Sequence, residues 1–174
     1  MKFKNWFALF SQTGQEIIDI SNQIDRVPDL IISNNHPSKV LNILKGVEYR
    51  WLISTEEAKT LDILDEVVSE PKETLITLNG WLRIVPPDKC EKYNIYNGHP
   101  GLITKYPELK GKDPQKRAWD DIHEYETVGS VIHKVVEEVD AGQINTYSEI
   151  STANILTLDE MYDALRSTSL ITWG

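Results

Sequence analysis

The chain has 174 residues, of which 40% are apolar and 26% charged, and its formal net charge is −9. A chain of this length can bury a full hydrophobic core, so we expect one domain over residues 1–174. No apolar run is long enough to span a membrane. The acidic balance argues against nucleic-acid binding, because such a chain repels a phosphate backbone.

The N-terminal segment and the cysteine content indicate the cellular compartment of the protein. The apolar run near the N-terminus is too short for a signal peptide and has no small-residue cleavage site after it, so a buried first strand explains it better. Cys90 is the single cysteine, which excludes an intramolecular disulfide and a cysteine-rich zinc site. These features predict a protein of the reducing cytoplasm, with Cys90 as a partly buried small side chain.

Apolar runs and helical patterns alternate through the first half of the chain. In order, the sequence predicts a strand, a helix, a strand, a short helix opened by Pro37, a strand and a helix capped by Ser54. Acidic residues in the first turn of that last helix suit the helix dipole. These six elements cover residues 5–10, 14–24, 29–34, 37–44, 48–54 and 54–68.

The second half continues the alternation. It predicts strands at 73–82 and 92–98, a helix at 113–125 led by Asp113 and Pro114, strands at 127–139 and 142–150, and a helix at 157–173. Thr157, with Glu160 three residues later, forms a capping box for the last helix. The pattern predicts an α/β, three-layer, Rossmann-like fold whose mostly parallel sheet carries an antiparallel strand toward the C-terminus.

Ligands bind at the carboxyl ends of the strands in sheets of this kind. Three loops follow predicted strands there, namely "SQTGQE", "NGWLRIVPP" and "NGHPG". The first is a strand-to-helix turn whose backbone N–H groups can hold an anion, although Glu16 adds a negative charge. A basic stretch, "KGKDPQKRAW", is either a solvated helix start or a rim that attracts an anionic ligand.

The loop "NGHPG" contains the most reactive combination of side chains. Asn97 and His99 are two residues apart, so in extended chain they share one face, and Gly98 should leave the opposite face open. An amide and an imidazole aimed at one oxygen atom can stabilise an oxyanion. Asp140, in a turn between two apolar strands, is the best-placed carboxylate to complete the group. By itself the motif is also compatible with a structured turn.

The remaining histidines are weaker candidates. His36 lies in a polar turn and His123 in a charged segment, so both should be solvated. His133 alternates with apolar residues, which is typical of a hydrogen-bonded strand histidine. The spacing of histidines and carboxylates indicates no metal site.

Six segments in order resemble the formyltransferases that use 10-formyltetrahydrofolate, most closely the glycinamide ribonucleotide formyltransferases of purine synthesis. They are "FALFSQTGQE", "LIISNN", "GWLRIVPP", "NGHPGLITKYPEL", "VGSVIHKV" and "EEVDAGQI". The resemblance runs from about Phe7 to Trp173. It implies a formyltransferase that moves a formyl group onto the primary amine of a small molecule, with no metal.

The resemblance also implies roles for individual residues. Asn97 and protonated His99 would stabilise the oxyanion, and Asp140 would orient the imidazole and help move protons through water. The folate would lie against the backbone of Arg83, Ile84 and Val85 and of the segment 136–140, which includes Val136, Glu137 and Asp140. The acceptor would bind at Ser11, Thr13, Gly14 and Gln15. A monomer or a homodimer is expected.

The acceptor loop departs from the family pattern. Gln12 and Glu16 stand where the purine enzyme has Gly and Asn, and Glu16 would face a ribonucleotide phosphate with like charge. Glycinamide ribonucleotide is the leading acceptor because the core matches best. An amino-sugar nucleotide, or a relative that binds folate or a nucleotide without turnover, is the alternative.

Overall fold

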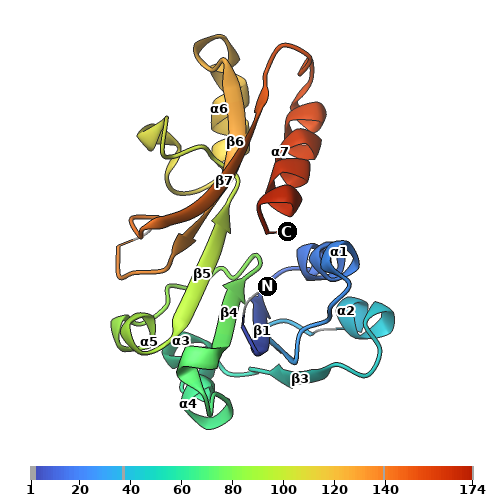
Figure 1. Ribbon diagram of the computed structural model, residues 1–174, viewed down its shortest axis with the longest axis vertical. Helices are drawn as coiled ribbons and strands as arrows, with labels where there is room; N and C mark the ends of the chain where they lie inside the picture. The colour runs from blue at the N-terminus through green and yellow to red at the C-terminus, as the bar shows by residue number, and fades with distance from the viewer. Residues whose placement is uncertain (1–2, 37, 139, 174) are drawn as a thin grey trace. The chain divides into compact units, whose positions relative to one another are not determined.

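The computed structural model describes residues 3–36, 38–138 and 140–173. The chain divides into two compact units, one made of residues 1–97 with 135–137 and the other of residues 98–134 with 138–174. Figure 1 labels the helices and strands of both.

The first unit is built on parallel strands. They are β1 (Asn5–Phe10), β2 (Leu30–Ser33), β3 (Glu48–Trp51), β4 (Thr74–Leu78) and β5 (Asn94–His99). Their order is β3-β2-β1-β4-β5, and each neighbouring pair is parallel. In this order the chain starts at β1, moves outward to β3 and returns to β4, so the crevice between β1 and β4 lies where the strand order reverses, as in doubly wound folds.

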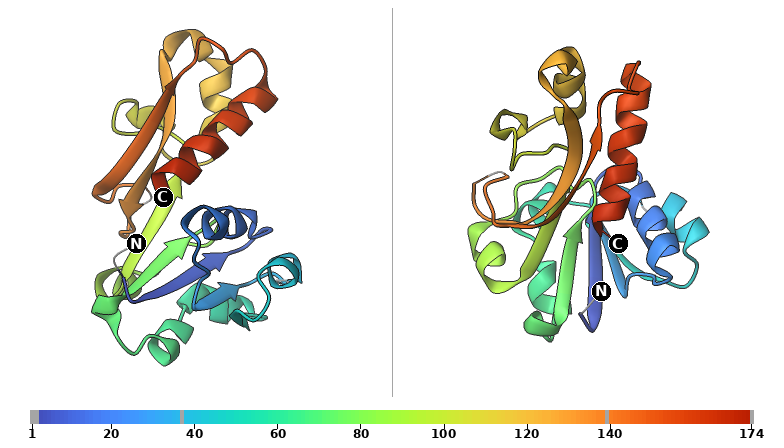
Figure 2. Two further views of the ribbon diagram at one scale, coloured as in Figure 1. Left: turned by 45° about the vertical axis from the view of Figure 1, so that its right-hand side comes forward. Right: turned by 45° about the horizontal axis from the view of Figure 1, so that its top comes forward.

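Helices cover both faces of this sheet (Figure 2). They are α1 (Gln15–Ile24), α2 (Ser38–Ile43), α3 (Thr55–Thr60), α4 (Ile63–Val67), the 3₁₀ turn η1 (Pro71–Glu73) and α5 (Pro87–Lys92). The core on one face joins Phe7, Leu9 and Ile76 to the helices α3, α4 and α5. The α1 start and Val40 of α2 meet Phe10 on the other face. The three-layer fold class predicted from the sequence is therefore confirmed.

The second unit contains an antiparallel strand pair and the longest helix. Its elements are η2 (Pro107–Leu109), α6 (Pro114–Asp120), η3 (Ile122–Glu124), β6 (Thr127–Lys134), β7 (Ile144–Ser151) and α7 (Leu158–Trp173). β6 pairs antiparallel with β7, as predicted. Buried hydroxyls fasten α7 to the pair, because Ser130 Oγ lies 2.8 Å from Thr168 Oγ1 and Ser148 Oγ donates to the Thr168 carbonyl at 2.7 Å.

Three helical segments differ from the prediction. The helix expected at 113–125 ends at Asp120, and the separate 3₁₀ turn η3 follows it. The helix expected at 54–68 is two helices, because Leu61 takes a left-handed conformation (φ 52°) and ends α3. Leu61 is fully buried, and burial of such a side chain is worth more than the roughly 1–2 kcal/mol of backbone strain. The helix α5 was missed, since its segment was read as part of a loop. Pro37, the predicted start of α2, lies outside the described residues.

The predicted cap residues accept hydrogen bonds as expected, but the capping box predicted at Thr157 is only half formed, because Glu160 bonds to the Leu156 N–H instead of the Thr157 N–H. Ser54 and Glu57 form a reciprocal capping box at α3, and Asp113 accepts a hydrogen bond from the Lys116 N–H at α6. Thr157 accepts from the Glu160 N–H, while the Glu160 carboxylate accepts from the Leu156 N–H.

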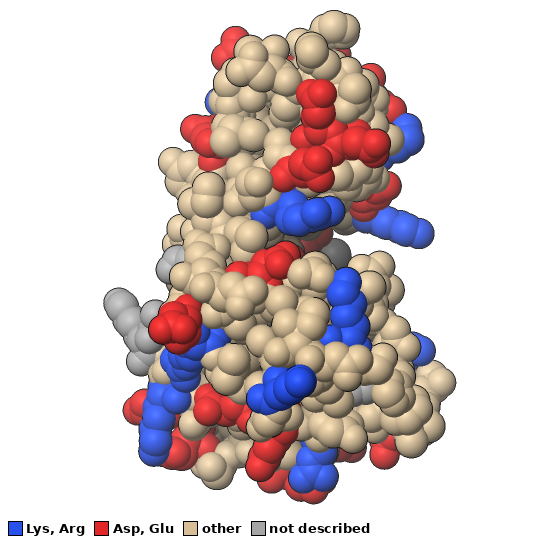
Figure 3. Space-filling model, turned by 90° about the vertical axis from the view of Figure 1, so that its right-hand side faces the viewer, with Lys and Arg blue, Asp and Glu red and all other residues tan. Residues whose placement is uncertain are grey.

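Among the described helices, none is both long and apolar enough to cross a membrane. On the face in Figure 3, Lys and Arg side chains are scattered among acidic ones.

Candidate active site

His99 is the buried end of strand β5, with 5% of its surface exposed. Its Nε2 lies 2.7 Å from the Leu109 carbonyl oxygen, and its Nδ1 lies 3.5 Å from Asp140 Oδ2. Since a carbonyl can only accept, the Nε2 atom must carry the proton of that hydrogen bond. Nδ1 is therefore the nitrogen that is left to gain or lose a proton, and it faces Asp140.

Asp140 is held by three groups. The carboxylate receives a hydrogen bond from the Gly111 N–H at 2.8 Å and lies 3.1 Å from His133 Nε2, in addition to its approach to His99. Burial alone would raise the pKa of Asp140, but His133, the charge of His99 and the Gly111 N–H together hold this pKa below its ordinary value. The residue is thus kept ionised beside the two imidazoles.

The pKa of His99 is lowered, chiefly because burial disfavours the charged imidazole. Asp140 and the Leu109 carbonyl act in the opposite direction, while His133 and Arg117 add to the lowering. Burial therefore favours the neutral imidazole, and Asp140 is the charged neighbour that favours its protonation.

Two glycines near His99 allow close packing, Gly101 against the His99 ring and Gly98 against Trp173. A Cβ on Gly101 would lie 3.1 Å from His99 Nε2, so a larger residue would push the ring. A Cβ on Gly98 would lie 2.8 Å from Trp173 Nε1. The expectation that Gly98 leaves an open face is therefore wrong, because the indole of Trp173 fills that face.

Asn97 is half-buried on the same strand, in register with Leu78 of β4. It is two residues from His99, and strand geometry places such residues on one face. The amide role of Asn97 stays a prediction.

The predicted acceptor loop is bound tightly to its surroundings. The Ser11 N–H donates to the Gly80 carbonyl at 3.0 Å, and the Ser11 hydroxyl accepts from the Leu82 N–H at 3.0 Å. The Thr13 hydroxyl accepts from the Gln15 N–H at 3.3 Å. Gly14 has φ 73° and caps α1 without a side-chain hydrogen bond. A Cβ there would collide with Val40 at 2.2 Å.

A chain of polar contacts places Glu16 at the edge of this loop. The Trp6 indole N–H donates to Thr77 Oγ1 at 2.9 Å, and the Thr77 hydroxyl donates to Asn79 Oδ1 at 2.7 Å. The Asn79 amide then donates to Glu16 Oε1 at 2.9 Å. Thr77 and Asn79 are buried, so the orientation of the Glu16 carboxylate is fixed from inside the unit.

The predicted folate-binding residues of the first unit present apolar surface. Ile84 is 71% exposed beside the buried Val85, with Arg83 also exposed. Val136 and Glu137 are exposed too, next to Val135, which packs against the same core as Val85. The indole N–H of Trp81, just before this segment, is buried and has no hydrogen-bond partner among the described residues. The exposed apolar side chains of Ile84 and Val136 fit a flat heteroaromatic ring. Val139, within the predicted segment 136–140, lies outside the described residues.

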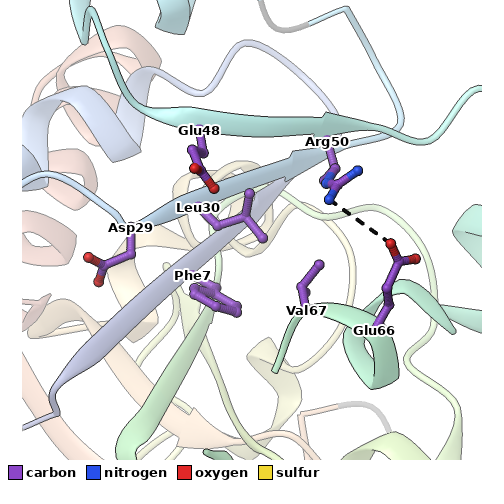
Figure 4. Close-up of a pocket in the computed structure, with 7 residues that line it drawn as sticks. All are labelled: Phe7, Asp29, Leu30, Glu48, Arg50, Glu66 and Val67. Carbon is purple, nitrogen blue, oxygen red and sulfur yellow. Dashed lines mark ion pairs between the residues drawn. The ribbon is translucent and has the colours of Figure 1, made fainter. Parts of the chain in front are cut away.

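The other histidines and the cavity add no further candidate. His36 is exposed against the ring of Trp51, and His123 is exposed. No group of three metal-ligating side chains occurs in the described parts of the chain. A cavity of about 330 Å³ in the first unit has an apolar floor and a charged rim that includes the pair Arg50–Glu66 (Figure 4), and no predicted site residue lines it.

Several residues that contact His99 and Asp140 were not predicted from the sequence to do so. His133 was expected to be a hydrogen-bonded strand histidine, and it is, with the Lys134 carbonyl and Asp140 as its partners. Leu109 and Gly111 contribute backbone atoms, a carbonyl and an N–H. The residue types in the sequence do not indicate such backbone contacts. The φ of 90° at Gly111 requires glycine in practice, and that is the only sequence signal.

Residues 14–171 match the family described as Formyl transferase, and the chain belongs to that family. It is 28% identical over 146 residues to the phosphoribosylglycinamide formyltransferase of Dictyostelium discoideum, covering 77% of this chain and 69% of the relative. It is also 28% identical over 149 residues to the trifunctional purine biosynthetic protein adenosine-3 of Bos taurus, covering 79% of this chain but 14% of that protein.

The fold is shared with solved structures of the same kind. The crystal structure of phosphoribosylglycinamide formyltransferase from Anaplasma phagocytophilum superposes with a TM-score of 0.80 at 21% identity, covering 96% of this chain and 81% of the other. The family match over residues 14–171 confirms the formyltransferase resemblance drawn from the six segments.

Proposed function

We propose that this protein transfers the formyl group of 10-formyltetrahydrofolate to the primary amine of glycinamide ribonucleotide, a step of purine synthesis. The observation that carries the proposal is the buried pair of His99 and ionised Asp140 within a chain of the formyl transferase family. The names of its relatives supply the acceptor.

The chemistry assigns one task to each residue. The amine attacks the formyl carbon, and the bond from that carbon to the folate nitrogen breaks. The Asn97 amide and protonated His99 stabilise the oxyanion. The negative charge of Asp140 orients the His99 imidazole. Asp140 also accepts the proton that the amine loses, through water, and the folate nitrogen gains a proton as tetrahydrofolate leaves.

Binding is assigned to two sets of loop residues. The folate lies on Arg83, Ile84, Val85, Val136, Glu137 and Asp140, and the acceptor phosphate binds at Ser11, Thr13, Gly14 and Gln15. We further propose that the protein works in the cytoplasm. It would act as a monomer or homodimer of one domain, without nucleic-acid partners.

A second acceptor is favoured by one observation. Glu16 places a fixed carboxylate beside the acceptor loop, where a phosphate would meet like charge. An acceptor without a phosphate at that position, such as the amine of an amino-sugar nucleotide bound another way, would avoid this repulsion.

The test is to mix the protein with 10-formyltetrahydrofolate and a panel of amines, then detect products heavier by one CO unit by mass spectrometry. Formylation of glycinamide ribonucleotide above the other amines supports the proposal. Formylation of another amine supports the alternative. Folate binding in a thermal-shift assay without any product, or release of formate without an acceptor, contradicts the transferase assignment.

A further inference from the structure

A single loop of the second unit, residues 108–112, contacts both catalytic side chains through its backbone. The Leu109 carbonyl accepts the hydrogen bond from His99 Nε2 at 2.7 Å. Two residues later the Gly111 N–H donates to Asp140 Oδ2 at 2.8 Å. The conformation of this loop therefore decides which tautomer His99 adopts and where the Asp140 carboxylate points.

One side chain holds the loop in that conformation. The guanidinium of Arg117, on α6, donates to four of its carbonyl oxygens: Nε to Lys112 at 2.9 Å, Nη1 to Glu108 at 2.6 Å, and Nη2 to Lys110 at 2.8 Å and Leu109 at 3.2 Å. The planar guanidinium offers five N–H donors in a fixed fork, which an ammonium group cannot reproduce.

Arg117 is itself well anchored. Asp113 caps α6 and also accepts a hydrogen bond from the Tyr162 hydroxyl at 3.0 Å, and Pro114 and Ala118 on the same helix are buried. The arginine is thus fixed to α6 on one side and to the loop on the other.

We propose that Arg117 is a positioning residue for formyl transfer, which acts on His99 and Asp140 by fixing the backbone of residues 108–112. It shares the Leu109 carbonyl with His99, so its loss frees that oxygen to move away from the ring. The kinetic part of this inference rests on the proposed function, whereas the structural part does not.

The experiment compares Arg117→Lys and Arg117→Gln with the matched variants Arg166→Lys and Arg166→Gln. Arg166 lies on α7 in the same unit with 67% of its side chain exposed. The ring nitrogens of His99 are observed by ¹⁵N NMR in protein without ligand and assigned with His99→Gln, and kcat and KM are measured with 10-formyltetrahydrofolate and the accepted amine.

In both Arg117 variants, His99 is expected to no longer occupy the Nε2–H tautomer alone. We expect kcat to fall about 10–100-fold and KM to change far less, because a small misplacement of reacting groups lowers the rate by that much. Only the Gln variant removes the cation, so only it should raise the His99 titration midpoint. The groups that face this ring are Asp140, His133, Arg117 and the Leu109 carbonyl. The Arg166 variants should match the wild type.

An unchanged His99 tautomer in folded Arg117→Lys would overturn the proposal, even where Arg117→Gln fails to fold. If the wild-type protein shows no transferase activity, the proposed function fails and kcat cannot be compared. The His99 tautomer in the Arg117 variants then tests the positioning role of Arg117 by itself.

Discussion

The Asn79 amide donates a hydrogen bond to the Glu16 carboxylate at 2.9 Å. Asn79 is in turn fixed by Thr77, which accepts from the Trp6 indole. A carboxylate at the first turn of α1 is thereby held beside the predicted acceptor loop. The helix terminus favours a negative charge there, and Glu16 already supplies one.

Glu16→Gln should therefore improve the use of a phosphorylated acceptor. Glutamine keeps an oxygen for the Asn79 amide but removes the like charge, so KM for glycinamide ribonucleotide should fall about fivefold, which is ~1 kcal/mol. Steady-state kinetics measure this, with Glu56→Gln, an exposed acid in the first turn of α3, as the control. An unchanged or higher KM would show that no phosphate binds beside Glu16.

His99→Ala and Asp140→Asn should each lower kcat by about 10²–10⁴, the range for a side chain that moves protons. Asparagine preserves the shape of Asp140 but removes the charge that faces His99. His123→Ala, at an exposed position, should leave kcat unchanged. Full activity in either catalytic variant would contradict the assignment.

Ile84→Asp should weaken folate binding with little effect on folding. The side chain is 71% exposed, and loss of its contact with a flat ring, at ~1.5 kcal/mol, corresponds to about a tenfold rise in KM for the folate. Ile53→Asp, at an equally exposed isoleucine of the same unit, should not change this KM. Equal effects of the two substitutions would place the folate elsewhere.

Gly98→Ala should destabilise the protein, because the new methyl group would press on the Trp173 indole. Overpacking of this kind costs about 1–3 kcal/mol. Thermal unfolding measures the loss, and the smaller ring in Gly98→Ala/Trp173→Phe should restore part of it. If the second substitution adds to the damage instead, the indole is not what restricts position 98.

Acidification should destabilise the folded protein through His99. Its pKa in the folded state is lowered by burial, so the unfolded chain binds the proton more readily and stability falls as the pH drops below about 6.5. Asp140, whose pKa is also lowered, adds a further loss at lower pH. Denaturant unfolding between about pH 7 and pH 5 should show a flatter dependence in His99→Gln than in wild type, with His123→Gln keeping the wild-type slope.

The strands and caps could be predicted from the sequence because they depend on local patterns. The alternation of apolar runs located the strands, and Ser54, Asp113 and Thr157 cap helices where expected. The break at Leu61 could not be predicted, because a leucine in the left-handed conformation is held there by tertiary burial that local propensity does not contain.

The candidate catalytic site could be predicted only in part, for a similar reason. His99 and Asp140 carry their chemistry in their side chains, and a pattern of residue types can find them. Leu109 and Gly111 contribute backbone atoms, and Arg117 looked like one cation in a solvated basic stretch. Its contacts with four carbonyls depend on the path of a loop that the sequence does not specify locally.

The contact between Gly98 and Trp173 also concerns the order in which the protein can be made. The strand that carries His99 leaves the ribosome long before residue 173, yet the indole that packs on Gly98 belongs to the final turn of α7. A nascent chain can therefore complete β5 and still lack the support of its catalytic turn. Because the last turn of α7 completes this packing, we expect the end of β5 to reach its final form only after residue 173 has been synthesised.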